Sequence, residues 1–345
     1  MLPLYRHLSL PCSLLWLLSS CSPALQDGVD PDDIEPPVPF PLDLAPIDVE
    51  AGEELIGMCQ SVTLDNDEPI AVNAVTMNAG PAWHHANWFF VPEEMYEGPD
   101  GSWRCHRRGF DTVAAAASGG VLFAMSTQAQ YEEQQFEPGA AMIIPPRSKV
   151  VGEVHLINAT DTPVSTGLEL EVTPIAMDDL ETRLVPGTFV YYDLELPPMA
   201  TSEFGADCMM EDYWGGPLDL RIHYVLPHYH DFGTGMRLTA LGGPMDGETI
   251  YEVESTIGEP LSGAPAQPFD LTGAEGVRFS CTYQNNTEDV IGWGLGGSEM
   301  CVAFFYTDSA VIWGGYVDGG GAFLGETDGV MQYGGPCRIA TSLVR

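Results

Sequence analysis

The adjacent residues His84 and His85 lie in an apolar stretch, PAWHHANWFF, where two imidazoles are unusual. Successive side chains of a β-strand point to opposite faces, so two neighbouring rings of a regular strand cannot reach the same metal ion. They can share an ion only if the strand bulges locally, or if one ring binds through Nδ1 and the other through Nε2. Without such a device, the pattern predicts one buried and one exposed ring with no role in chemistry.

A second pair, His228 and His230 in PHYHDFG, has the spacing of a chelating motif. Residues two apart share one face of a strand, so both rings can bind one ion, although the same spacing is equally typical of structural histidines. A cupin would require a glutamate three or four residues after His230. Those positions hold Gly233 and Thr234, which excludes the cupin motif.

Two single residues complete the candidate chemistry. His155 alternates with the apolar Val154 and Leu156, a pattern that by itself predicts a half-buried, hydrogen-bonded ring. Met300 begins an apolar strand and by itself predicts core packing, but a thioether ligand selects copper, especially Cu(I). Two histidines and one methionine would form a redox copper site with an open position, whereas a structural zinc site is closed by four ligands.

The elements that must position these residues are strands. Apolar and β-branched runs separated by turns rich in Gly, Pro, Asn and Asp fill residues 46–175 and begin again near Thr188, and we found no alternation of strands with helices. This pattern predicts an all-β chain built from two similar antiparallel sandwiches. Asp178–Gly187 is predicted to connect them, with room for one helical turn.

The charge balance excludes one class of partner. The chain has 12 Lys and Arg residues against 50 Asp and Glu residues, a net charge of −38, and would be repelled by phosphate backbones. We therefore expect no nucleic-acid partner, and we interpret the acidic residues as a solvated surface.

The N-terminus predicts export. Arg6 and His7 precede an apolar run, Leu8–Leu18, that is too short to span a bilayer. The following LSSC resembles a bacterial lipobox, which implies cleavage before Cys21 and its lipidation; a plain secretory signal is the alternative. We expect residues 22–43, which are acidic and proline-rich, to form a disordered tether. The protein is then extracytoplasmic, in the periplasm or at the cell surface, and touches the membrane only through its anchor.

Six of the eight cysteines follow this leader. An even number in an oxidising compartment favours disulfides, and the absence of a CxxC pair argues against a zinc ribbon or a thioredoxin-like motif, but spacing alone does not choose the pairing. The remaining histidines, His106 and His223, are interpreted as structural. The sequons at Asn158 and Asn285 are expected to carry no glycan in a bacterial lipoprotein.

Taken in order, the segments HH, VHLIN, HYH and SEMC resemble the copper type II, ascorbate-dependent monooxygenase family, which includes peptidylglycine α-hydroxylating monooxygenase and dopamine β-monooxygenase. The resemblance extends from about Phe40 to Thr307 and includes the stretch Phe279–Cys301. It implies two antiparallel jelly-roll β-sandwich domains, residues 44–186 and 187–345, that each hold one copper ion. The two ions would face each other across a solvent-filled cleft.

Carried over residue by residue, the resemblance assigns both ligand sets. The electron-transfer copper would be held by His84, His85 and His155, and the oxygen-activating, catalytic copper by His228, His230 and Met300. It further implies the disulfides Cys59–Cys105, Cys208–Cys337 and Cys281–Cys301. The implied cofactors are two copper ions, O2 and ascorbate or another one-electron reductant, used to hydroxylate a C–H bond of a small organic substrate.

The chain departs from the peptide-amidating branch at two positions. That branch has an arginine two residues before HxH and a tyrosine four residues after the methionine, and both recognise a substrate carboxylate; this chain has Leu226 and Phe304 there. If these two residues line the site, a more apolar or neutral substrate is expected. The sequence suggests no protein partner.

Two rival functions remain. A copper-binding lipoprotein could sequester or relay copper without catalysis, and a zinc-binding or metal-free jelly-roll adhesion module could retain the histidines as relics. Retention of all six ligands argues against the adhesion module. Only the monooxygenase requires two redox-active coppers and the open position beside Met300.

Overall fold

The structure is a computed structural model, and it describes residues 37–343 except 126–128, 256–262, 264–266 and 295–296. The predicted signal peptide, the lipidation site Cys21 and the tether up to Pro36 lie outside the described residues. Residues 40–42, which the sequence assigned to the tether, instead form strand β1 (Phe40–Leu42), because Leu42 is buried in the core. Among the described residues, no helix is both long and apolar enough to cross a bilayer.

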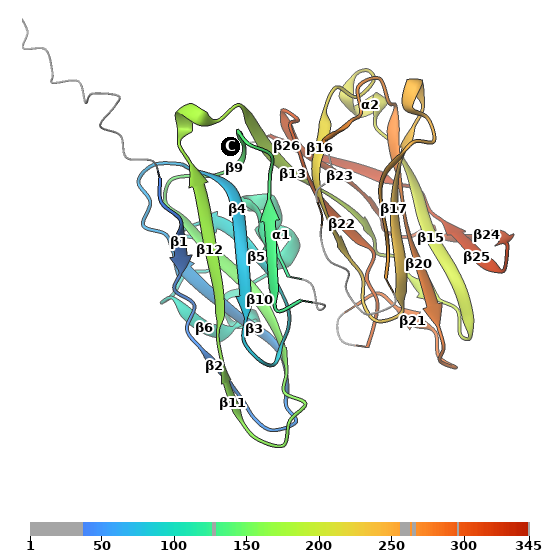
Figure 1. The fold of residues 1–345 in the computed structure, drawn as a ribbon. Coiled ribbons are helices and arrows are strands. Elements are labelled where there is room, and N and C mark those ends of the chain that lie inside the picture. The colour runs from blue at the N-terminus through green and yellow to red at the C-terminus, as the bar shows by residue number, and fades with distance from the viewer. Residues whose placement is uncertain (1–36, 126–128, 256–262, 264–266, 295–296, 344–345) are drawn as a thin grey trace, which may run out of the picture. The chain divides into compact units, whose positions relative to one another are not determined.

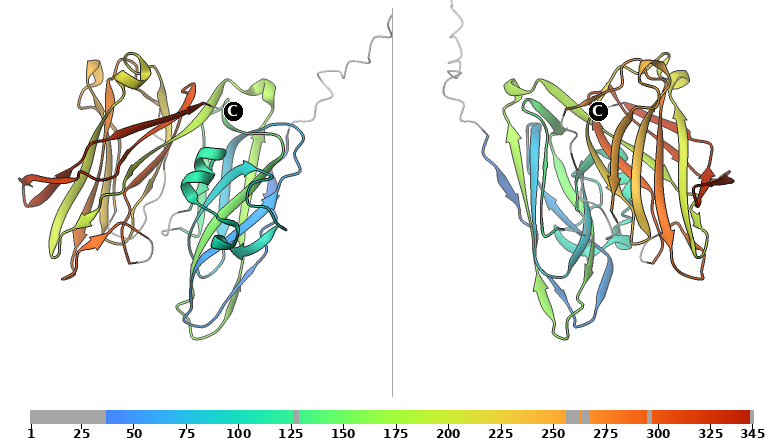
Figure 2. Two further views of the ribbon diagram at one scale, coloured as in Figure 1. Left: turned by 180° about the vertical axis from the view of Figure 1, so that it is seen from behind. Right: turned by 45° about the vertical axis from the view of Figure 1, so that its right-hand side comes forward.

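The first sandwich packs two sheets face to face. One is β6-β3-β10-β5-β7, formed by Gly101–Arg104, Glu54–Thr63, Ser148–Ile157, Trp83–Pro92 and Gly120–Ala124. The facing layer is β1-β12-β4-β9 with β8 beside β4, where the new strands are Leu168–Ile175, Ile70–Ala79, Ala140–Ile144 and Tyr131–Gln135. A small sheet pairs β2 (Ile47–Val49) with β11 (Val164–Thr166). Figure 2 shows helix α1 (Thr112–Ser118) beside this sandwich, where it packs on β5 and β7.

The second sandwich repeats the two-layer arrangement. Its outer sheet is β18-β17-β20-β15-β25-β24, formed by Thr249–Glu254, Gly233–Leu241, Gly276–Asn285, Ala200–Met209, Val330–Gly334 and Ala322–Thr327. The facing layer contains β13, β22, β16, β19, β23 and β26, formed by Thr182–Tyr191, Val302–Thr307, Arg221–His228, Phe269–Asp270, Val311–Val317 and Arg338–Leu343. Strands β14 (Glu195–Leu196) and β21 (Ile291–Gly292) pair separately. The remaining elements are short helices: η2 (Cys105–Arg108), η3 (Met177–Asp179), α2 (Glu211–Trp214) and η4 (Gly243–Met245).

The all-β fold of jelly-roll sandwiches predicted from the sequence is confirmed, with three parallel pairs, β13–β9, β13–β23 and β15–β25, among the antiparallel ones. Each sandwich buries its own aromatic and aliphatic side chains. In the second, Phe189 of β13 stacks on Phe279 of β20 at a centroid distance of 5.2 Å. Burying one such side chain contributes about 1.5–3 kcal/mol, so this core is a main source of stability.

Strand β13 belongs to both sandwiches (Figure 1). Its first residues, Thr182–Leu184, pair with β9 of the first sandwich, and Val185–Val190 pair with β22 of the second. The expected connector Asp178–Gly187 is therefore mostly strand, and the predicted domain boundary after Pro186 falls inside β13. Tyr224, Leu226 and Tyr306 of the second sandwich also pack into the core of the first. The two sandwiches are consequently joined by backbone pairing and by shared apolar packing.

The three implied disulfides are confirmed. Cys59–Cys105 ties β3 to η2, Cys208–Cys337 ties β15 to the segment before β26, and Cys281–Cys301 ties β20 to the residue before β22. The last bond attaches the residue next to Met300 to the outer sheet. It thereby limits the freedom of the segment that carries this methionine.

The two sequons have a structural role. The Asn158 amide donates to the carbonyls of Val49, Glu50 and Thr162, and its Oδ1 accepts from the Thr160 hydroxyl at 2.7 Å. Both sequon asparagines are buried, with exposed fractions of 2% for Asn158 and 1% for Asn285.

The second sandwich contains the same loop. The Asn285 amide donates to the carbonyls of Leu196 and Asp289, and its Oδ1 accepts from the Thr287 hydroxyl at 2.8 Å. Each asparagine closes a loop by satisfying backbone carbonyls, which explains the paired N-x-T motifs without glycosylation.

Candidate metal centre

The first histidine cluster lies on the neighbouring strands β5 and β10. Each of His84, His85 and His155 offers a ligand atom, and these atoms lie within 4.8 Å of one another. In the β5–β10 ladder, His155 pairs with His85 and Leu156 pairs with Trp83, so His84 is the extra residue of a β-bulge. The bulge suspends the alternation of the strand, which is how two adjacent rings reach one point.

The strand on the other side of β10 bulges at the same level. Val154 pairs with Met58 and Leu156 with Leu55, which leaves Ile56 and Gly57 opposite His155. Gly57 has a φ of 65°, in the left-handed region that glycine adopts without strain. Both neighbours of β10 are therefore irregular next to His155, which locates the cluster at a distortion of the sheet.

The rings of this cluster contact each other closely. Nδ1 of His84 lies 3.1 Å from Nδ1 of His85 across the bulge. Burial lowers the pKa of His85 well below the ordinary value, and burial followed by the neighbouring His155 ring lowers the pKa of His84. Neutral imidazoles are the form that binds metal ions.

Glu54 is a polar neighbour that the sequence interpretation missed. Its Oε1 lies 2.9 Å from Nε2 of His155, and its side chain is 54% exposed. It stands at the first position of β3, and nothing in its local sequence distinguishes it from the many other glutamates of the chain.

The second cluster is built differently. His228 is the last residue of β16, Met300 precedes β22, and Nε2 of His228 lies 3.3 Å from Sδ of Met300. His230 lies beyond the strand end, not within a strand as its spacing suggested. Its ring is nevertheless 5.2 Å from that of His228 between centroids.

The protonation of these rings suits metal binding. Nδ1 of His230 lies 2.8 Å from the carbonyl of Ser298, which can only accept, so Nδ1 carries the proton and the lone pair is on Nε2. Burial lowers the pKa of His230, and it lowers the pKa of His228 to about 3. The buried side chain of Glu299 accepts hydrogen bonds from the backbone N–H groups of His230 and Met300. The sequence interpretation overlooked this residue as well.

The two clusters adjoin each other. The ring of His85 lies 5.9 Å from that of His228 and 6.3 Å from that of His230. The described residues thus place the clusters in contact, whereas the family resemblance implied a solvent-filled gap between them. The shared strand β13 and the apolar packing between the sandwiches account for this proximity.

One cavity of about 520 Å³ contains all six predicted ligands. Its walls are mainly apolar and include Ala116, Val302 and Phe304; Glu153 and Asp231 are its carboxylates, and its described lining contains no lysine or arginine. Burial raises the pKa of Glu153. The cavity therefore offers little to bind an anionic ligand.

Of the two expected substrate contacts, only Phe304 lines this cavity. Leu226 does not, and the prediction for it is wrong. Its side chain is 1% exposed and packs in the core of the first sandwich, because β16 turns this residue toward that core.

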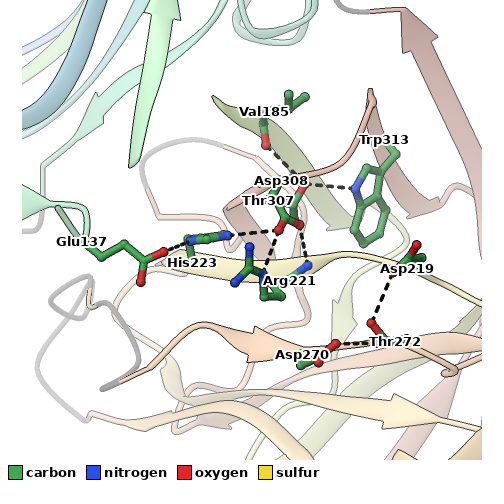
Figure 3. Close-up of polar contacts among 10 residues, drawn as sticks. All are labelled: Glu137, Val185, Asp219, Arg221, His223, Asp270, Thr272, Thr307, Asp308 and Trp313. Atoms are coloured by element: carbon green, nitrogen blue, oxygen red, sulfur yellow. Dashed lines mark hydrogen bonds and ion pairs between the residues drawn. The ribbon is translucent and has the colours of Figure 1, made fainter. Parts of the chain in front are cut away.

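The two remaining histidines lie apart from both clusters. His106 is exposed on η2. His223 lies at a bulge of β16, and its buried ring bridges Glu137, at 3.1 Å from Nδ1, and Asp308, at 3.6 Å from Nε2 (Figure 3). Asp308 also pairs with Arg221. His223 thus links the loop before β9 to the end of β22, in agreement with a structural role.

Comparisons with known proteins give no relative by sequence and only distant likeness in structure. The chain matches no protein-family model, and no curated protein matches its sequence. Structures with a similar fold include the major capsid protein P2 from bacteriophage PM2, 9% identical, covering 78% of this chain and 97% of that chain, with a TM-score of 0.33. The STIV MCP is also 9% identical, over 78% of this chain and 95% of that chain, with a TM-score of 0.32. Likeness at this level carries no argument about function.

Proposed function

We propose that the protein is a copper-dependent monooxygenase that uses O2 and a one-electron reductant such as ascorbate to hydroxylate a C–H bond of a small, uncharged substrate. The observation that carries the proposal is the convergence of two separate ligand sets on one apolar cavity. A single cluster would suit a storage or structural site. Two adjoining clusters beside a cavity suit a reaction that needs more than one electron.

The donor atoms support copper. The first cluster, His84, His85 and His155, offers imidazoles, and the second combines two imidazoles with the thioether of Met300. Imidazole donors suit copper and zinc alike, but the thioether selects copper, especially Cu(I), whereas structural zinc sites are closed by four ligands rich in thiolate. All six cysteines of the folded part are in disulfides, so no thiolate competes for the metal.

The two clusters would have different roles in the reaction. Bound copper would supply the one-electron chemistry with O2 that amino-acid side chains lack. His228, His230 and Met300 would hold the copper ion that supplies the chemistry with O2, and His84, His85 and His155 would hold a copper ion that supplies the second electron. Burial lowers the pKa of His84, His85, His228 and His230, which favours the neutral imidazole that binds a metal without first losing a proton.

The cavity supports an uncharged substrate. Its apolar walls favour a hydrophobic molecule, and Phe304 offers an aromatic surface. A carboxylate substrate would need a cationic partner, but the described lining has none, and Glu153 and Asp231 would repel it. This argument also disfavours peptides with a free carboxyl end.

Copper loading tests the proposal. The mature protein is loaded anaerobically, reduced with ascorbate and then exposed to O2 with a panel of neutral aromatic and aliphatic compounds. We expect two coppers per chain, reduction of both, and oxygen uptake that depends on the compound and yields its hydroxylated form. Binding of one copper or none contradicts the two-site proposal. Two reducible coppers without substrate-dependent uptake across the panel would indicate the copper-handling lipoprotein instead.

A further inference from the structure

Glu299 is a carboxyl side chain with an exposed fraction of 0%. Burying a carboxylate costs several kcal/mol unless hydrogen bonds replace its water. Here the replacement comes from the backbone. Oε2 accepts from the N–H of His230 at 2.9 Å and from that of Met300 at 3.1 Å, and Oε1 accepts from the N–H of Phe232 at 2.7 Å.

These bonds connect two segments that lack the support of a strand. His230 lies beyond the end of β16, and Met300 lies before the start of β22. Both residues are predicted copper ligands, and their N–H groups donate to the same oxygen of Glu299. The carboxylate therefore supplies the backbone connection that a ladder of β-sheet hydrogen bonds supplies to the first cluster.

Neighbouring bonds extend this connection. The ring of His230 donates to the carbonyl of Ser298, and the hydroxyl of Tyr283 donates to the carbonyl of Met300 at 2.7 Å. The backbone N–H of Glu299 donates to the carbonyl of Gly292 at 2.9 Å, which attaches the segment to β21. The orientation of His230 and the position of Met300 thus depend on residues 298–300, with Glu299 at the centre.

We propose that Glu299 is a positioning residue that holds His230 and Met300 in register so that one copper ion can bind both. This inference rests on the proposed copper site at the second cluster. Glu299 is not itself a ligand, because its oxygens already accept three backbone N–H groups and its side chain is fully buried.

Replacing the carboxyl group of Glu299 by an amide of the same shape tests its role as an acceptor. A carboxylate only accepts hydrogen bonds, so both oxygens can face N–H groups. In Glu299→Gln, the same shape carries an NH2 group at one of these positions, where it faces an N–H donor and cannot bond. Either the Phe232 turn or the His230–Met300 pair must then separate from the side chain.

The experiment measures copper coordination and not turnover. Parent protein, Glu299→Gln and the exposed control Glu195→Gln are titrated with Cu(I) against a chromophoric chelator, and sulfur coordination is measured by X-ray absorption. We expect Glu299→Gln to keep the equivalent held by His84, His85 and His155 at parent affinity, to bind the other at least tenfold more weakly and to lose most of the copper–sulfur signal. Glu195→Gln should match the parent.

Parent-like affinity and an unchanged sulfur signal in Glu299→Gln would overturn the inference. Retention of the equivalent held by the three-histidine cluster shows that the variant is folded. Glu299→Asp adds a rescue test, because it keeps an acceptor-only group on a shorter stem; we expect its affinity at the methionine-containing cluster to lie between those of the parent and Glu299→Gln. An aspartate variant no better than the glutamine variant contradicts a role for the carboxylate. A parent with copper–sulfur coordination but no turnover would refute the proposed function and leave this inference intact.

Discussion

The two histidine clusters reach similar donor sets by different means. The first stands on two paired strands, β5 and β10, and a bulge at His84 turns neighbouring rings toward the same point. The second stands at a strand end and in an irregular segment, where the buried Glu299 connects the ligand backbones. A β-sheet can position ligands through the register of its strands. Ligands outside the strands need another polar group to hold them.

The clusters also differ in exposure. The rings of the first are half-buried, and Glu54, which is largely exposed, contacts His155. In the second, His230 and Met300 are half-buried as well, but His228 is buried and Glu299, which contacts their backbone, is fully buried. A buried site has a lower effective dielectric constant, so the same change of charge or polarity should cost more in the second cluster.

The largest effect is expected from removal of the thioether. Met300→Ile deletes a ligand and keeps the apolar volume, so substrate-dependent oxygen uptake should fall by more than about 100-fold, the upper end for groups that merely support a metal ligand. Copper binding at the first cluster should be unchanged. Met209→Ile, at an exposed position of a β-strand, is the matched control. Activity that survives Met300→Ile would show that the oxygen site is assigned to the wrong residues.

Each cluster has a disulfide in its own sandwich, so the two can be perturbed one at a time. Replacing Cys281 and Cys301 by serine opens a loop of 20 residues and should lower the free energy of unfolding by about 3 kcal/mol. It should also weaken copper binding at Met300, the neighbour of Cys301. Replacing Cys59 and Cys105 should destabilise the first sandwich to a similar degree but leave copper–sulfur coordination intact. Urea unfolding with copper titration tests both, and equal loss of sulfur coordination in the two variants would contradict this.

Acid should destabilise the metal-free protein through its buried histidines. The pKa of His228 is lowered to about 3 by burial, so between pH 6.5 and about 3 the unfolded state binds a proton that the folded state does not. Its contribution is complete above pH 6.5 and is lost as the pH falls, by up to about 1.4 kcal/mol per pH unit.

A variant comparison isolates this term from the many carboxylates. His228→Asn should flatten the dependence of unfolding free energy on pH between 6.5 and 5 more than His106→Asn, because His106 is exposed. Urea unfolding at several pH values measures the slopes. Identical slopes in the two variants would contradict a neutral, buried His228.

The smallest effect is expected at Glu54. Its contact with His155 is a hydrogen bond from a carboxyl group that is 54% exposed, and contacts of such exposed groups are worth about 0–1 kcal/mol. Glu54→Gln should therefore change copper affinity at the first cluster by no more than about fivefold. A loss at Glu54 as large as that at Glu299 would remove the distinction between the two clusters.

Local patterns in the sequence predicted the strands and the all-β fold, because alternation and turn residues act over a few positions. The quoted segments also named the residues that the structure brings together: His84, His85 and His155 in one cluster, and His228 with Met300 in the other. A local bulge was one of the two options that the adjacent histidines allowed, and the ladder shows that the strand bulges at His84.

What only the tertiary structure decided depends on residues far apart in the chain. In the sequence, Glu299 is one of many acidic residues, and only the fold buries it beside His230. Leu226 was expected at the site, but β16 directs its side chain into the core of the first sandwich. The contact between the clusters likewise joins residues of two sandwiches that share β13. A sequence pattern reports which faces are apolar and which residues can bind a metal. It does not report which faces meet, because that is decided by packing over the whole chain.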